Sequence, residues 1–230
     1  MVNVISVNKT DVGRERDHNE DSVWSSDELG VYIVADGLGG YESGEVASQL
    51  AIKIISETMK KHLPQTPPEQ LQQLLINTLE ITNKQVYNVA QQANQHQNMS
   101  TTIVLALLQL PTVYISHAGD SRVYLFREGQ IRQLTEDDVW ITTGNLRNVL
   151  TKAIGQEHAL EPSSYKSTLN AGDWLLLCSD GLWDMLSDEQ ILAIFEQNNQ
   201  SPTTLADALI NAANNAGGLD NITVIALKII

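Results

Sequence analysis

The chain has 230 residues, 42% of them hydrophobic, and a formal net charge of −14 at pH 7. This length is enough for one domain with a large core, so we expect residues 1–230 to form a single domain. The negative charge would repel a phosphate backbone at long range, which argues against nucleic acid as a partner.

The first part of the chain combines short apolar runs with two helical patterns. The apolar runs predict strands at residues 2–7, 22–25 and 31–35. Ser43 is predicted to cap a helix that ends before the proline-rich segment 64–68. A second helix is predicted from about residue 69 to 95, with a buried face that includes Leu79 and Val89.

The rest of the chain is rich in predicted strands. They lie at residues 101–108, 112–117, 122–126, 130–134, 174–178 and 222–229. The turn at 127–130 predicts a hairpin, Ser187 is predicted to cap a helix, and a last helix is expected at 203–215. Many antiparallel strands with helices in two separate blocks indicate an α+β domain in which a β-sandwich is covered by helices.

Signals for membranes and disulfides are missing from the sequence. No apolar run approaches the roughly 20 residues that cross a bilayer, and the first residues lack the basic and apolar regions of a signal peptide. The single cysteine, Cys178, lies in an apolar run and can form no disulfide within the chain. We therefore expect a cytoplasmic protein without a membrane partner.

Five aspartates lie at the ends of strand-like runs, each beside a small or polar turn residue. They are Asp21, Asp36, Asp120, Asp180 and Asp220. At a separation of ~4 Å and an effective dielectric of ~20, each like-charged pair of carboxylates would cost about 4 kcal/mol. Such a cluster persists if its protons stay on or if cations bind, and hard divalent cations prefer oxygen ligands. The pattern therefore predicts a divalent-metal site.

Neighbouring residues suggest what such a site could do. Gly37 could offer its carbonyl as a further ligand, and Asn221 could hold a ligand carboxylate or a water. Two cations bridged by a carboxylate and a water would lower the pKa of that water and prepare it for in-line attack on phosphorus. Arg16 is the candidate to bind the phosphate, because its planar fork matches phosphate oxygens.

Six motifs occur together in one order. They are Arg16-x-x-Asn19-Glu20-Asp21, Val34-Ala35-Asp36-Gly37-Leu38-Gly39-Gly40, Gly44-x-x-Ala47-Ser48, Gly119-Asp120-Ser121-Arg122, Cys178-Ser179-Asp180-Gly181-Leu182 and Gly218-x-Asp220-Asn221-x-Thr223. Over about residues 7–224 this set resembles the protein phosphatase 2C family, the metal-dependent Ser/Thr protein phosphatases, and in particular its bacterial stand-alone members. The resemblance implies a four-layer αββα sandwich of two antiparallel β-sheets flanked by helices.

The resemblance also implies an activity and its partners. The expected substrates are proteins that carry phosphoserine or phosphothreonine, hydrolysed by attack of the metal-bridging water without a phosphoenzyme. A Ser/Thr kinase would oppose this activity, and we expect a monomer. By the same resemblance Asp36 bridges two Mn²⁺ or Mg²⁺ ions, the Gly37 carbonyl binds one of them, and Asp180 and Asp220 bind the second.

Four further residues receive roles from the resemblance. Glu20 and Asp21 act mainly through waters. Asp120, together with Asp180, matches the third and weaker metal position of the family. Arg16 matches the arginine that binds the substrate phosphate.

The chain departs from the family pattern most clearly in two places. Asp138 stands where the family usually has a histidine, directly after Asp137. The family's flap of a few tens of residues would lie near 140–147, where only residues 141–146 separate Trp140 from the Arg-Asn-Val-Leu-Thr motif. We expect the flap to be largely absent, which would open the site and weaken any selectivity that the flap provides.

Other interpretations stay open. A single Asp-Gly is usually only a turn, and the metal site rests on the ordered set. A degenerate phosphatase that binds phosphoproteins without turnover is the alternative function, suggested by the missing flap and by Asp138. The intact aspartates argue against this alternative. A metal nuclease is disfavoured by the net charge of −14.

Overall fold

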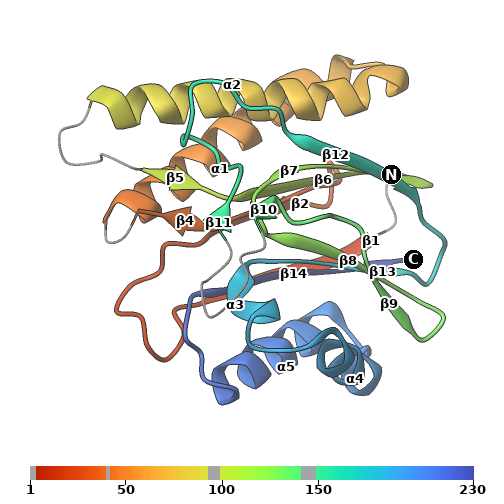
Figure 1. Cartoon of the computed structure of the whole chain (residues 1–230). Helices are drawn as coiled ribbons and strands as arrows, with labels where there is room; N and C mark the ends of the chain where they lie inside the picture. The colour runs from red at the N-terminus through yellow and green to blue at the C-terminus, as the bar shows by residue number, and fades with distance from the viewer. Residues whose placement is uncertain (1–3, 40–41, 93–98, 141–148) are drawn as a thin grey trace.

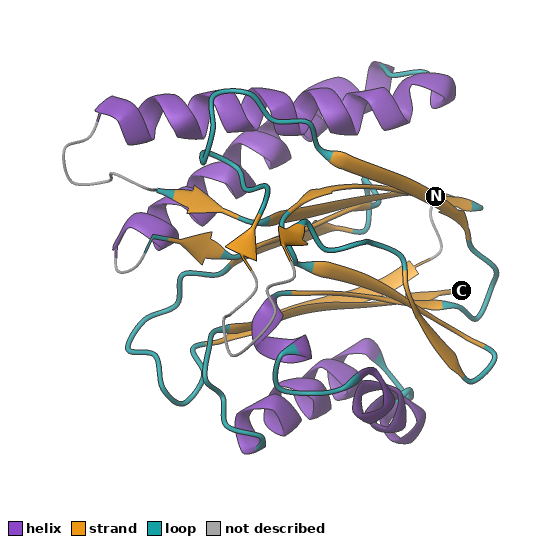
Figure 2. Cartoon of the chain, in the orientation of Figure 1, coloured by secondary structure: helices purple, strands orange, loops and turns teal. Residues whose placement is uncertain are grey.

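The computed structural model describes residues 4–39, 42–92, 99–140 and 149–230. Within them, two five-stranded antiparallel sheets lie face to face between two layers of helices (Figure 1, Figure 2). The predicted α+β sandwich with two antiparallel sheets and flanking helices is therefore confirmed. None of the described helices has the length and apolar character that a bilayer-spanning helix needs.

The two sheets are named after a central strand of each. The β3 sheet contains, in spatial order, β12 (Ser163–Thr168), β7 (Thr112–Ala118), β6 (Ile103–Gln109), β3 (Val31–Ala35) and β2 (Ser22–Ser26). The β13 sheet contains β1 (Val4–Asp11), β14 (Ile222–Ile229), β13 (Trp174–Cys178), β8 (Arg122–Arg127) and β9 (Gln130–Gln133). Two short pairs join β4 (Gly37–Leu38) to β5 (Ser100–Thr101) and β10 (Val139–Trp140) to β11 (Val149–Leu150).

The helices form the outer layers. Those on the β3 sheet are α1 (Glu42–His62) and α2 (Leu71–Gln92), joined through the 3₁₀ turns η1 (Leu63–Gln65) and η2 (Pro68–Gln70). Those on the β13 sheet are α3 (Asp180–Trp183), α4 (Asp188–Asn198) and α5 (Pro202–Asn215). Ser187 caps α4 as predicted, in a capping box with Gln190, and Ser201 caps α5.

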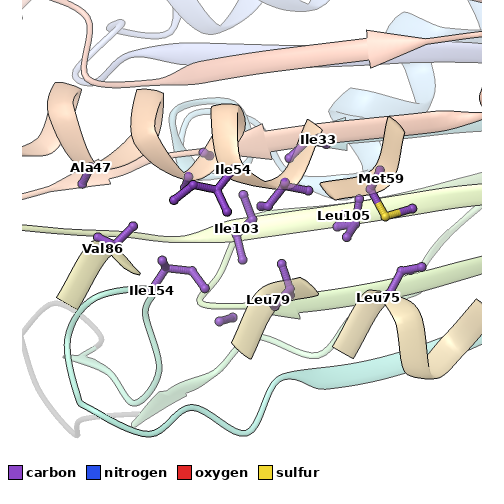
Figure 3. Close-up of a cluster of buried hydrophobic side chains, with 14 of the residues drawn as sticks. Ile33, Ala47, Ile54, Met59, Leu75, Leu79, Val86, Ile103, Leu105 and Ile154 are labelled. Carbon is purple, nitrogen blue, oxygen red and sulfur yellow. The ribbon is translucent and has the colours of Figure 1, made fainter. Parts of the chain in front are cut away.

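Three apolar layers hold the sandwich together, because the central strands are buried on both faces. In β3, Ile33 faces α1 and α2, whereas Tyr32 and Val34 face the other sheet. In β13, Leu176 faces α4 and α5, whereas Leu175 lies between the sheets. Figure 3 shows the layer between the β3 sheet and its helices, where side chains of both helices point toward the strands. This packing fixes the strand ends from which the aspartates project.

The start of α1 differs from the prediction. Ser43 lies inside the helix, which includes Glu42, so the assignment of Ser43 as its cap is wrong. The first turn of α1 packs against backbone from elsewhere in the chain: a Cβ added to Gly37 would lie 2.3 Å from the Gly44 carbonyl oxygen. We infer that this tertiary contact, which the local sequence does not reveal, fixes the first turn.

Other predictions differ in detail or stay untested. Val89 is 38% exposed, and the neighbouring Ala90 takes the buried position in α2. The strand β12 and the short helix α3 were not predicted. The shortened flap falls mainly on residues 141–148, which lie outside the described residues, so it stays a prediction. The single domain over residues 1–230 also stays a prediction.

Candidate active site

The five predicted aspartates come from the ends of strands in both sheets. Asp21 directly precedes β2, and Asp36 directly follows β3. Asp120 lies between β7 and β8, Asp180 is the first residue of α3, and Asp220 lies two residues before β14. The two sheets therefore contribute ligand candidates to one edge of the sandwich, as the positions in the sequence predicted.

The charges of these carboxyl groups act on one another. Burial is the main cause that raises the pKa of Asp21 to about 8, and the charges of Asp180 and Asp220 raise it further. The pKa of Asp36 lies well above its usual value, first because of burial and then because of the other four carboxylates. Burial and the charge of Asp180 raise the pKa of Asp120 to about 7. The five groups therefore share one electrostatic environment.

Asp180 shows most directly that the charge of the cluster is only partly compensated. Burial and the charge of Asp220 raise the pKa of Asp180 to about 6, although a hydrogen bond with Asp36 lowers it. A hydrogen bond between two carboxyl groups requires a proton on one of them. Among the described residues, the buried Oδ1 atom of Asp180 has no hydrogen-bond partner. Such an oxygen is an acceptor that a proton donor or a cation could satisfy.

The donor set fits hard divalent cations, although the side chains do not converge on one point. In the described part of the chain, no three His, Cys, Asp or Glu side chains are arranged so that they could hold a metal ion. The carboxyls instead repel one another and keep raised pKa values. Oxygen ligands of this charge density are those that Mg²⁺ and Mn²⁺ prefer, and bound cations would remove the repulsion.

Backbone hydrogen bonds fix the loop that carries Asp36. The Asp36 carbonyl accepts hydrogen bonds from the Thr102 N–H and from the Thr101 hydroxyl, both at 2.8 Å. The Gly37 N–H donates to the Glu20 carbonyl at 3.2 Å. A side chain at Gly37 would collide with the backbone of Gly44 and Glu20, so the missing Cβ allows this close approach. These contacts position both Asp36 and the carbonyl of Gly37.

The side chain of Asn221 holds the loop between β1 and β2 at three points. Its Nδ2 donates to the carbonyls of Val12 at 2.9 Å and His18 at 3.0 Å, and its Oδ1 accepts from the Glu20 N–H at 2.8 Å. The sequence suggested that this side chain could hold a ligand carboxylate or a water, whereas the structure shows it bound to backbone. Its own N–H donates to Asp220 Oδ1 at 2.8 Å, so the main chain of Asn221 orients that carboxylate.

Two buried hydroxyls act on the Glu20–Asp21 pair. Ser179 Oγ donates to Asp21 Oδ2 at 2.7 Å, and Ser48 Oγ donates to the Glu20 carbonyl at 2.6 Å. The Glu20 side chain lies 3.1 Å from His18 Nε2. The role of Ser179 was missed, although Ser179 belongs to the motif that carries Asp180, because its partner is 158 positions away in the chain.

Arg16 lies in the site and already contacts one of the predicted ligands. Its Nη2 atom donates to Asp220 Oδ2 at 2.6 Å, and the two side chains are 40% and 31% exposed. Both oxygens of Asp220 therefore accept a hydrogen bond, one from Arg16 and one from the Asn221 N–H. The side chain of Arg16 is therefore accessible from solvent while it contacts a predicted metal ligand.

The turn that carries Asp120 is held by an aromatic residue and an ion pair. Trp183 Nε1 donates to the Asp120 carbonyl at 3.1 Å, and the Arg122 guanidinium stacks on the Trp183 ring at 3.7 Å. Arg122 also forms hydrogen bonds of 3.0 and 2.7 Å with the Asp137 carboxylate. Gly119 adopts φ +106°, which a residue with a side chain would rarely adopt.

Comparison with known proteins identifies the family. A family model described as Protein phosphatase 2C matches residues 13–212. The chain belongs to the protein phosphatase 2C family. It is 34% identical over 237 residues to the serine/threonine phosphatase Stp of Listeria innocua, which covers 96% of this chain and 94% of that protein. It is 35% identical over 236 residues to the protein phosphatase PhpP of Streptococcus pneumoniae, which covers 94% of this chain and 93% of that protein.

A solved phosphatase structure has the same fold. The catalytic domain of the serine/threonine protein phosphatase PstP, in complex with two manganese ions, superimposes with a TM-score of 0.87 at 32% identity. The match covers 99% of this chain and 98% of that domain. The protein phosphatase 2C fold predicted from the motifs is thus present over nearly the whole chain.

A pocket of about 450 Å³ lies next to the Asp36 loop of this protein phosphatase 2C chain. The described residues that line it include Leu38, Ser100, Val149 and Gln156. None of the five aspartates lines it. The pocket is therefore a neighbour of the carboxylates, separate from the place where their charges interact.

Proposed function

We propose that this chain hydrolyses phosphoserine and phosphothreonine in proteins at the edge where the five aspartates lie. The chain is a serine/threonine protein phosphatase of the 2C type. The proposal for its site rests on one observation: Asp36 is buried among four other carboxyl groups, and its pKa is raised well above the usual value. A bound proton or a nearby cation would stabilise such a group at neutral pH.

The roles of the metal ligands follow from the same cluster. Asp36, Asp180 and Asp220, with the Gly37 carbonyl, would hold two Mn²⁺ or Mg²⁺ ions, and Asp21 would act mainly through waters. When bound, such ions lower the pKa of water and neutralise charge on the phosphate. Two manganese ions in the related PstP domain support this assignment. The chain itself contributes a backbone around Asp36 that is already fixed by hydrogen bonds. The carboxylate is therefore oriented before an ion or a substrate binds.

Arg16 would orient the substrate. Its side chain is 40% exposed and its Nη2 atom lies 2.6 Å from a predicted ligand, so a phosphate bound to it would also lie beside the carboxylates. A planar fork can donate two parallel hydrogen bonds to phosphate oxygens and so fix the direction of attack. Glu20, whose backbone is held by Asn221 and Ser48, would support water molecules at the rim of the site.

Three finer statements belong to the proposal. Asp120 would bind a third and weaker ion together with Asp180. The phosphoproteins that the chain acts on would be products of a Ser/Thr kinase. We also propose that the chain acts as a cytoplasmic monomer. The names of the Listeria and Streptococcus relatives support phosphoprotein substrates.

The test is hydrolysis of an aryl phosphate with and without Mn²⁺. Asp36→Ala and Asp220→Asn should each abolish the Mn²⁺-dependent rate, because each removes a predicted ligand, while Glu28→Gln, which removes an exposed carboxylate elsewhere, should retain it. Unchanged activity in both ligand variants would refute the assignment. Wild-type protein that binds a phosphopeptide but shows no turnover with Mn²⁺ would instead establish the alternative of a degenerate binding module.

A further inference from the structure

Asp138 lies at a junction beside the Asp120 turn. Its side chain is only 9% exposed. Oδ1 accepts hydrogen bonds from Lys152 Nζ and from Ser163 Oγ, both at 2.9 Å. Oδ2 accepts from the Gly119 N–H at 3.2 Å and lies 3.5 Å from Nδ1 of His117. One carboxylate therefore connects β7, β12 and the residues after β11.

The backbone of Asp138 strengthens the same connection. Its N–H donates to the Gly119 carbonyl at 3.0 Å, and its carbonyl accepts from the Thr151 N–H at 2.8 Å. Gly119 is therefore bound to Asp138 twice, once through each of its own peptide groups. The residue that follows Gly119 is Asp120, so movement of Asp138 would be transmitted to the predicted ligand through one peptide unit.

A histidine could not make this set of contacts. A neutral imidazole offers one acceptor nitrogen, whereas Asp138 accepts side-chain hydrogen bonds from Gly119, Lys152 and Ser163. The ammonium group of Lys152 also compensates the negative charge, which burial would otherwise make costly. Asp138 thus stands in place of the usual histidine and forms a different set of hydrogen bonds. Because these bonds are complete, Asp138 does not support the alternative of a degenerate phosphatase.

We propose that Asp138 is a positioning residue for Asp120. It holds the Gly119 side of the turn, while Trp183 holds the Asp120 carbonyl from the other side at 3.1 Å. The turn is thereby fixed between two elements, which keeps the carboxyl of Asp120 within reach of the charge of Asp180. The inference rests on the proposed function, since Asp120 acts there as the ligand of a third ion.

The test is a double-mutant cycle between positions 138 and 120, measured as kcat for an aryl phosphate at saturating Mn²⁺. Asp138→Ala should lower kcat roughly tenfold, about the effect of one hydrogen bond to a charged group. In the Asp120→Ala background the same change should cause no further loss, because the residue that it positions is gone. Glu136→Gln, which removes an exposed carboxylate two residues away, should leave kcat unchanged.

A second readout follows the proposed bond itself. Asp138→Asn keeps the size of the side chain but leaves one acceptor oxygen. Because the Lys152 ammonium can only donate, the amide oxygen should face Lys152, and the amide nitrogen, which cannot accept, should face the Gly119 N–H. Exchange of the Gly119 amide with deuterated water should therefore become faster in this variant than in the wild type and in Glu136→Gln. This measurement needs no turnover, so it tests the proposed bond even if Asp138→Ala does not fold.

The outcomes distinguish failure of the positioning role of Asp138 from failure of the proposed phosphatase function. Additive losses in the cycle, unchanged kcat in Asp138→Ala or unchanged Gly119 exchange would each overturn the positioning role while wild-type phosphatase activity persists. Wild-type protein without Mn²⁺-dependent turnover would overturn the proposed function, and the positioning role with it.

Discussion

The ion pair between Arg16 and Asp220 couples the predicted phosphate site to a predicted metal ligand. Arg16 Nη2 donates to Asp220 Oδ2 at 2.6 Å, and the Asn221 N–H donates to Oδ1 at 2.8 Å. An ion that binds the carboxylate of Asp220 would therefore compete with the guanidinium of Arg16 for the same negative charge. Of the two donors, Arg16 is the one that can move away, because it donates from a side chain whereas Asn221 donates from the backbone. We predict that Arg16→Ala binds Mn²⁺ more tightly than the wild type while it loses activity.

The expected magnitude follows from exposure. Because the two side chains are 40% and 31% exposed, the pair is screened by solvent and contributes about 0.2–1 kcal/mol, the range of exposed ion pairs. Release of the pair would tighten Mn²⁺ binding by about 1.4- to 5-fold, since ~1.4 kcal/mol corresponds to a factor of ten. The activity should fall much further, because the substrate phosphate loses its bidentate donor.

The matched control is Arg14→Ala. Arg14 is exposed on the same loop, with its N–H bound to the Gly218 carbonyl at 2.7 Å, so its replacement removes the same charge close to the site without releasing Asp220. Calorimetric titration of Mn²⁺ into the three proteins measures the affinities. Equal affinities of the Arg16 and Arg14 variants would show that only the overall charge matters. That result would refute the competition for Asp220.

Two further predictions concern the outer ion and the pH dependence. Asp120→Ala should slow turnover yet keep the tight Mn²⁺ sites, and calorimetry that showed loss of these tight sites would contradict the separate role of Asp120. The pKa values of Asp21, about 8, and Asp180, about 6, are raised above the ordinary 3.8. These carboxyls keep protons in the folded chain that the unfolded chain releases, so their stabilising contribution is complete below about pH 4 and is lost as the pH rises through 6 to 8. The melting temperature in EDTA should therefore fall between pH 5 and pH 8.5, and added Mn²⁺ should raise it more at the higher pH; a melting temperature that rises with pH in EDTA would count against the cluster.

The central strands could be predicted because both of their faces are buried. β3 and β13 have bounds identical to the predicted runs 31–35 and 174–178, since each is a continuous apolar segment between turn residues. β12 was missed because it is an edge strand of small and polar residues, whose alternation of partial and full exposure leaves no apolar run. Val89 was misassigned because helical spacing alone cannot decide which neighbour faces the sheet.

Of the candidate site, only the residues that belong to local sequence motifs could be predicted. The aspartates stand beside turn residues at strand ends, and that pattern is local. Their supports are not local: Asn221 binds Val12 and His18 more than 200 positions away, and Trp183 reaches Asp120 across 63 positions. The sequence does not show which carbonyl the indole of Trp183 meets. Such pairs depend on the topology of the two sheets.

The cost of the carboxyl cluster bears on the choice between an enzyme and a binding module. Buried carboxyls with raised pKa values destabilise the fold at neutral pH, and asparagine at the same positions would remove the repulsion. A domain that only bound phosphoproteins would need Arg16 but would have no physical reason to keep Asp21, Asp36 and Asp180 in this environment. A cation that replaces the protons removes the repulsion between the carboxylates. The free energy released in this way favours binding of the cation. The retained cluster is therefore better explained by metal-dependent hydrolysis than by binding alone.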